Sequence, residues 1–165
     1  MASDLPDIEA AGPAPIEAVG ESTVAPAKAM SALWYRLANS QWRTLAVVAP
    51  GNGPGAWRIA QALFAVAEKR PRLLKAVNAI DASLERMAAV AHVLSPAKLV
   101  AAADRTRFVL AVDSPLENPA AIGLLSTCEA VVLLLERRRT RIPDAQRILE
   151  LIGRERFIGA VLGGS

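Results

Sequence analysis

Continuously apolar runs alternate with amphipathic segments along most of the chain. Four of these runs predict buried strands: Leu45–Ala49, Phe108–Asp113, Val131–Leu135 and Phe157–Leu162. Apolar strands that alternate with helices are typical of a parallel sheet whose two faces are both covered. The pattern therefore predicts a three-layer α/β/α domain with a mostly parallel sheet of four or five strands. Ligands of such folds bind at the carboxyl ends of the strands.

Turn and capping residues indicate where the helices begin. A helix from about Trp57 to Lys69 is predicted after the first strand. Three further starts combine an N-cap residue or an acidic first turn with an early proline: Ser95 and Pro96, Asn118 and Pro119, Pro143 and Asp144. These signals divide the second half of the chain into regular strand and helix units.

The segment from Arg70 to Arg107 allows two interpretations. Apolar residues recur at spacings of three and four, which predicts one long amphipathic helix: Leu73, Val77, Ile80, Leu84, Met87, Ala91 and Leu94. In the other interpretation, RLLKAVNAID is a strand that ends at Asp81. The helical spacing has more matches and is favoured, although the architecture requires a strand here.

The first 29 residues differ from the rest in composition. They are rich in Ala, Pro and acids, lack aromatic residues, and carry a net charge of −4, which leaves +7 for residues 30–165 of a chain whose total is +3. Such a segment buries too little apolar area to offset its ordering entropy, so we predict a disordered acidic tail before one domain. The tail is a linker or shields the basic domain from anionic surfaces.

Composition narrows the class of protein. No apolar run approaches the roughly 18 residues of a membrane span, and no secretory signal opens the chain. Cys128 is the single cysteine and is expected to be a buried, inert thiol, while His92 lacks the neighbours that a metal site needs. The basic residues that give residues 30–165 their net charge of +7 are not interleaved with aromatic residues, which argues against nucleic-acid binding. We expect a soluble, cytoplasmic protein without a metal.

Three of the seven aromatic residues, Trp34, Tyr35 and Trp42, lie within nine residues in the segment SALWYRLANSQWR. This segment is predicted to be a short helix with Ser31 as its N-cap. The favoured interpretation is a helix that packs on the sheet edge. The alternative is a docking surface for another chain.

Glycine and proline crowd the turn that follows the first predicted strand: Pro50, Gly51, Asn52, Gly53, Pro54 and Gly55. In a working P-loop, backbone N–H groups and a lysine hold the phosphates, while a Ser or Thr hydroxyl binds Mg²⁺. Here Pro54 and Gly55 occupy the positions where that lysine and hydroxyl are expected.

The order of these segments resembles the cytoplasmic P-loop domain of the bacterial tyrosine kinases of exopolysaccharide synthesis, within the wider MinD/ParA-type ATPases. Pro50, Gly51 and Gly53 match the phosphate loop, and Asp113 with Pro115 matches the strand-end motif that is similar to Walker B. Residues 138–140 match a later arginine-containing loop. The likeness covers residues 45–66 and 95–163. It implies a P-loop NTPase-like fold, ATP or ADP with Mg²⁺ as cofactor, and a membrane polysaccharide co-polymerase as partner.

The departures from this family predict a degenerate phosphate loop. Pro54 removes both the lysine and a backbone donor, while Gly55 and Ala56 replace the hydroxyls. Trp57 is placed to fill nucleotide space, and the family's metal-binding strand end has only Asp81 as its counterpart. The tyrosine cluster of the family is absent, since Tyr35 is the only tyrosine. A loop without the lysine and the Mg²⁺-binding hydroxyl lacks several kcal/mol of transition-state stabilisation for phosphoryl transfer. The sequence thus predicts no catalytic residues and no bound cofactor.

The run ERRRTR supplies four arginines, Arg137, Arg138, Arg139 and Arg141. They would contact an anionic partner or nucleotide at the carboxyl edge of the sheet. The favoured alternative is a solvated loop between a strand and a helix.

Four functions remain open. The first is a non-catalytic relative of the polysaccharide kinases that docks on a membrane polysaccharide assembly factor at the inner membrane, or on a second copy of itself. The second is an active or nucleotide-sensing ATPase or kinase of the same fold. The third is a MinD/ParA-like spatial regulator, and the fourth is an unrelated α/β domain whose glycines only form a tight turn.

Overall fold

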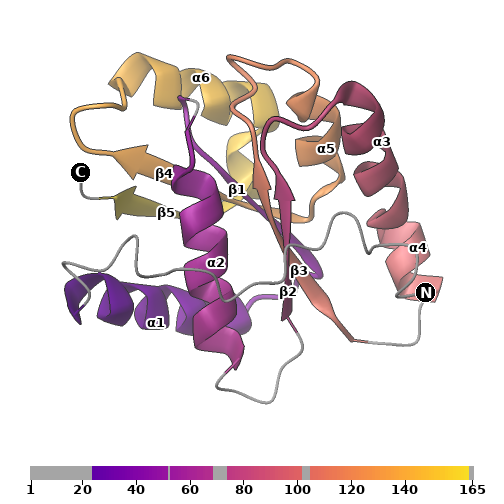
Figure 1. Ribbon diagram of the computed structural model, residues 1–165, viewed down its shortest axis with the longest axis horizontal. Coiled ribbons are helices and arrows are strands. Elements are labelled where there is room, and N and C mark those ends of the chain that lie inside the picture. Colours follow the sequence, from indigo (N-terminus) through magenta and orange to yellow (C-terminus); the bar gives the residue numbers. More distant parts are fainter. Residues whose placement is uncertain (1–23, 52, 69–73, 102–104, 164–165) are drawn as a thin grey trace.

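A computed structural model describes residues 24–51, 53–68, 74–101 and 105–163 (Figure 1). All five strands of its single sheet run parallel, in the order β2-β3-β1-β4-β5. Their bounds are Thr44–Val48 for β1, Leu74–Ala79 for β2, Arg107–Val112 for β3, Ala130–Glu136 for β4 and Phe157–Gly163 for β5. The four predicted strands are confirmed, and so is their parallel arrangement.

Burial along the strands follows their position in the sheet. Every residue of the central strand β1 is buried, because β3 and β4 flank it and helices cover both faces. The edge strand β5 instead alternates half-buried and exposed residues, and Ile158 and Leu162 are among the exposed ones. A continuous apolar run therefore does not distinguish the buried central strands from the edge strand β5.

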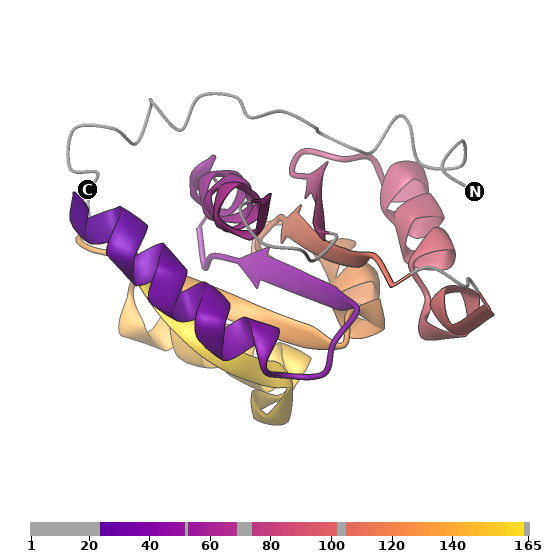
Figure 2. The same ribbon diagram turned by 90° about the horizontal axis from the view of Figure 1, so that it is seen from below.

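Helices cover both faces of the sheet and give three layers (Figure 2). On one face lie α1 (Val24–Ala38) and α2 (Gly55–Glu68). On the other lie α3 (Leu84–Val93), α4 (Pro96–Ala101), α5 (Ala121–Thr127) and α6 (Ile142–Ile152). A short 3-10 helix, η3 (Arg154–Arg156), precedes β5. The α/β/α prediction is confirmed.

The favoured helix across residues 73–94 is wrong, and the alternative strand is correct. Residues 74–79 form β2, and α3 begins only at Leu84, after Ser83 accepts the Arg86 N–H at 3.1 Å as N-cap. The spacings of three and four arose because apolar residues of a strand, a turn and a helix happened to fall in one register. Leu84, counted on the apolar stripe, is 67% exposed.

Two predicted helix starts are also corrected. Ser31 lies inside α1, which begins at Val24 and so includes the last residues assigned to the acidic tail. Residues 1–23 of that tail lie outside the described residues. Asn118 does not cap α5, which starts at Ala121; its side-chain oxygen instead accepts the Ala120 N–H at 3.2 Å in the preceding turn.

The remaining starts are confirmed. Ser95 accepts the Lys98 N–H at 3.4 Å and Pro96 opens α4. α6 has proline in its first positions and Asp144 in its first turn.

The aromatic cluster near α1 belongs to the core. Trp34 and Trp42 are 1% and 3% exposed and meet edge to face, with ring centroids 6.3 Å apart. The Trp42 indole N–H donates to the Leu37 carbonyl at 2.7 Å, and the Arg107 guanidinium lies 4.7 Å from the ring centre. The packing interpretation therefore holds, and these two residues offer no docking surface. Tyr35 differs, since it is 58% exposed.

Candidate functional site

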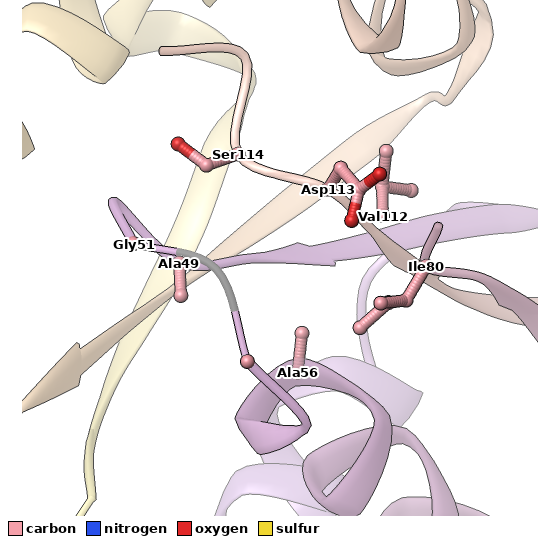
Figure 3. A pocket seen from close by; sticks show the side chains of 8 residues that line it. Ala49, Gly51, Ala56, Ile80, Val112, Asp113 and Ser114 are labelled. Carbon is pink, nitrogen blue, oxygen red and sulfur yellow. The ribbon is translucent and has the colours of Figure 1, made fainter. Parts of the chain in front are cut away.

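The glycine-rich loop lies at the switch point of the sheet. It follows β1, and β3 and β4 continue the sheet on either side of that strand. The carboxyl ends of the three strands meet at one edge, where α/β folds bind ligands. A shallow, open hollow lies there, lined by Ala49, Gly51, Gly53, Ala56, Ile80, Val112, Asp113 and Ser114 (Figure 3). It encloses no space large enough for a water molecule, so it is not a preformed small-molecule pocket.

Two residues of the loop have clear structural roles, while Asn52 lies outside the described residues. Gly53 has φ +145°, in the region that only glycine enters without strain. The Pro54 carbonyl accepts the Arg58 N–H at 3.0 Å and so starts the hydrogen bonding of α2. The proline at the lysine position therefore serves to begin a helix.

A buried hydroxyl ties the loop to the neighbouring strand. Ser114, two residues after the end of β3, is 1% exposed and donates its hydroxyl to the Pro50 carbonyl at 2.7 Å. The same oxygen accepts the Leu116 N–H at 3.3 Å. The sequence motif around Asp113 contained Ser114, but sequence reasoning gave it no role. Its hydroxyl is committed to holding the loop.

The Asp113 carboxylate links two loops beside the hollow. It is 6% exposed and accepts the Asp81 N–H at 3.1 and 3.2 Å and the Asn118 side-chain amide at 3.3 Å. Asp81 has φ 56°, so the turn after β2 bends sharply to reach it. In Figure 3 the Asp113 carboxylate points towards Ile80, away from Ser114. The structure thus brings together the two acids that the family resemblance singled out, through a backbone contact.

The contact between Glu136 and Gly55 was missed from the sequence. Glu136 ends β4, and its Oε1 lies so close to Gly55 that a β-carbon on that glycine would collide with it. The same β-carbon would lie 2.9 Å from Leu134 Cδ2. Gly55 opens α2, so the chain places its own carboxylate at the positive end of a helix. Phosphate groups of nucleotides bind at such helix ends.

The arginines after β4 form a closed turn. The Glu136 carbonyl accepts the Arg139 and Thr140 N–H groups at 3.1 and 2.9 Å, and the Thr140 hydroxyl accepts the Glu136 N–H at 2.8 Å. The Arg139 guanidinium pairs with Glu136 Oε2 at 3.3 Å and points towards the loop, within 4.0 Å of a β-carbon built on Gly53. The side chains of Arg137, Arg138 and Arg141 are exposed.

Trp57 does not line the hollow. Its side chain is half-buried and packs with the apolar residues between α1, α2 and the sheet. The expectation that it fills nucleotide space is therefore not met, because the first turn of α2 directs Ala56 towards the hollow instead.

The residues present do not fit a nucleotide with Mg²⁺. The Ser114 hydroxyl already donates to a carbonyl, no lysine lines the hollow, and Glu136 faces the start of α2. Within the part of the chain that the structure describes, no three His, Cys, Asp or Glu residues gather to hold a metal ion.

Cys128 is 2% exposed, and burial raises the pKa of its thiol from 9.0 to about 12; nearby Arg156 opposes this rise and Glu129 adds to it. The thiol is protonated at neutral pH, which agrees with the predicted inert cysteine. None of the helices between residues 24 and 163 that the structure describes is long and apolar enough to cross a membrane.

The fold is similar to a solved structure described as the kinase domain of VpsO. The two superpose with a TM-score of 0.65 over 87% of this chain and 96% of that domain, at 14% sequence identity. This likeness supports the fold, a five-stranded parallel sheet with helices on both faces, which is consistent with a P-loop NTPase-like fold. No protein-family model matches the sequence, and no curated protein matches it.

Proposed function

We propose that this chain is a non-catalytic relative of the bacterial tyrosine kinases and acts by binding a protein partner in exopolysaccharide synthesis or export. The motif resemblance supports the family, and the neighbouring fold, described as a kinase domain, agrees with it. The partner we favour is a membrane polysaccharide co-polymerase, which would hold the protein at the cytoplasmic side of the inner membrane.

The contact between Glu136 and Gly55 carries the non-catalytic part of the proposal. A phosphate at the N-terminus of α2 would meet a carboxylate there and no lysine. Two like unit charges about 4 Å apart repel by about 1 kcal/mol in water and about 4 kcal/mol at an effective dielectric constant of 20. A working phosphate loop gains attraction from its lysine, whereas here the Glu136 carboxylate opposes a phosphate and its ion pair with Arg139 offsets part of that repulsion.

A second function, weak nucleotide binding, is favoured by one observation. α2 is 14 residues long, and its first residues border the hollow beside glycine backbone. Backbone N–H groups at a helix N-terminus attract phosphate without a lysine. Such binding would not depend on Mg²⁺ and would not lead to turnover.

Calorimetric titration of the full chain with ATP and ADP, with and without Mg²⁺, separates these functions. We expect no heat and no thermal shift. A nucleotide that did bind would stabilise the folded state by about 2.7 kcal/mol at 100 times its Kd, so binding would be detected as a higher melting temperature. Restoring a lysine and a hydroxyl (Pro54→Lys with Gly55→Ser) should restore binding only when Glu136→Ala is added, since residue 136 faces the new side chain. Tight Mg²⁺-dependent binding by the natural chain, or phosphate release that is lost in Asp113→Ala, would establish an active ATPase.

Deleting the gene tests the pathway. We expect a lower yield of exopolysaccharide with normal cell division, restored by the natural gene and by an Asp113→Asn copy that folds. Normal polymer with misplaced division would instead favour the MinD/ParA-like alternative.

A further inference from the structure

Four arginines, Arg137, Arg138, Arg139 and Arg141, form a fixed basic surface that we call the arginine loop. The Glu136–Thr140 hydrogen bonds close its turn, and the Arg137 N–H donates to the Gly163 carbonyl at 3.2 Å. Arg138 has φ 65°, a left-handed conformation that holds the bend. Its backbone is thus anchored to β4 and β5, and its side chains project from the carboxyl edge of the sheet.

Most of this charge has no carboxylate partner within the described parts of the chain. Arg139 pairs with Glu136, whereas no ion pair joins Arg137, Arg138 or Arg141 to any described residue. Along the same edge, Asp81 follows β2 and Asp113 follows β3, on the opposite side of β1. The edge is therefore divided into an acidic half and a basic half.

The start of α1 lies on the side of the molecule towards which β4 and β5 run. Figures 1 and 2 both place the beginning of α1 on the same side as the carboxyl ends of these two strands. Residues 1–23 precede this point and contain five acids and no lysine or arginine: Asp4, Asp7, Glu9, Glu17 and Glu21. An extended chain spans about 3.3–3.6 Å per residue, so Glu21 lies within about 11 Å of Val24 and Glu17 within about 25 Å.

We propose that the acidic segment, residues 1–23, binds the arginine loop of its own chain. The segment carries −5, and Arg137, Arg138 and Arg141 form no ion pair with any described residue. Carboxylates pair with guanidinium groups through charge-assisted hydrogen bonds, and attachment to the same chain raises their effective concentration to the millimolar range. Each exposed pair contributes little, so the contact is a salt-sensitive sum of several. This contact does not depend on whether the phosphate loop binds nucleotide.

A spin label in the acidic segment tests the contact in the full-length protein. The label is placed at Ala14→Cys, since Cys128 is buried and does not compete for it. We expect broadening of the backbone amide signals of residues 137–141 at about 0.01 M salt, where the Debye length is about 30 Å, and loss of broadening at about 1 M salt, where it is about 3 Å. Changing the five acids to their amides should also abolish it.

Two charge-matched variants locate the surface. Arg137→Gln with Arg138→Gln and Arg141→Gln should remove the broadening. The control variant removes the same charge from three exposed arginines at the amino ends of the strands, Arg36, Arg105 and Arg154, and should retain it. Equal effects of the two variants, or no broadening at low salt, would overturn the proposal. In a mixture of spin-labelled molecules with isotope-enriched molecules that carry no spin label, broadening of the latter would also overturn the proposal. The segment would then bind a second copy.

Discussion

The substitution Gly55→Ala tests the close approach of Glu136 and Leu134 to the start of α2. Alanine ordinarily stabilises a helix relative to glycine by roughly 0.5–1 kcal/mol. Gly55 opens α2 without a positive φ, so backbone strain does not require glycine there. The added methyl group would instead meet Glu136 Oε1 and lie 2.9 Å from Leu134 Cδ2.

The expected cost follows from what must move. The Glu136 side chain is 23% exposed and can swing away at the loss of its pair with Arg139, which is worth about 0–1 kcal/mol. Leu134 is 2% exposed in the core between the sheet and α2, and displacing its methyl group costs about 1–3 kcal/mol. The helix preference of alanine offsets part of this packing cost. We therefore expect Gly55→Ala to lower the free energy of unfolding by about 1–2 kcal/mol.

Urea denaturation measures this change, and Gly123→Ala is its matched control. Gly123 lies inside α5 with no atom within 4 Å of an added β-carbon, so alanine there should be neutral or stabilising by up to about 1 kcal/mol. Adding Glu136→Ala to Gly55→Ala should recover part of the loss, since Leu134 still crowds the site. If Gly55→Ala proved as stable as Gly123→Ala, the close approach of Glu136 and Leu134 would be refuted.

Two further expectations test the core. Trp34→Ala should lower the free energy of unfolding by about 3–5 kcal/mol, whereas exposed Tyr35→Ala should change it by about 0.5 kcal/mol or less, as thermal denaturation would record; similar losses would contradict the packing of α1. The pKa of the Cys128 thiol is about 12 in the folded chain against an ordinary 9.0, so its contribution to stability is complete below pH 9 and is lost as pH rises towards 12. Unfolding free energy should therefore fall by up to about 1.4 kcal/mol per pH unit above pH 9, and Cys128→Ala should reduce that slope; an unchanged slope would show that the thiol is not buried.

The parallel sheet could be predicted because its central strands are apolar along their whole length. Leu45–Val48 has helices over both faces and strands on both sides, so every position demands an apolar residue. A strand was not the favoured prediction for β2, because this edge strand is not apolar along its whole length. Lys75 and Asn78 are only half-buried there, and the resulting mixed pattern resembled a helix.

Helix boundaries were predictable where a side chain performs the capping. Ser95 bonds the backbone of its own helix, and its spacing from Pro96 is visible in the sequence. Asn118 carries the same residue signal, yet its side chain turns to Asp113 and to the turn before α5. A local motif cannot distinguish these outcomes, since the competing partner is a carboxylate at the end of β3.

The candidate site shows the same division between local and distant information. Pro54 can be seen from the sequence alone to stand where the resemblance places a lysine, but the side chain that lies at the start of α2 cannot. Glu136 reaches Gly55 because β4 pairs with β1, which brings residues 81 positions apart into contact. Its turn then carries the arginine loop to the same edge. Under the proposed function, the carboxylate at the start of α2 and the outward-facing arginines favour a surface that recognises acidic protein segments over a loop that assists phosphoryl transfer.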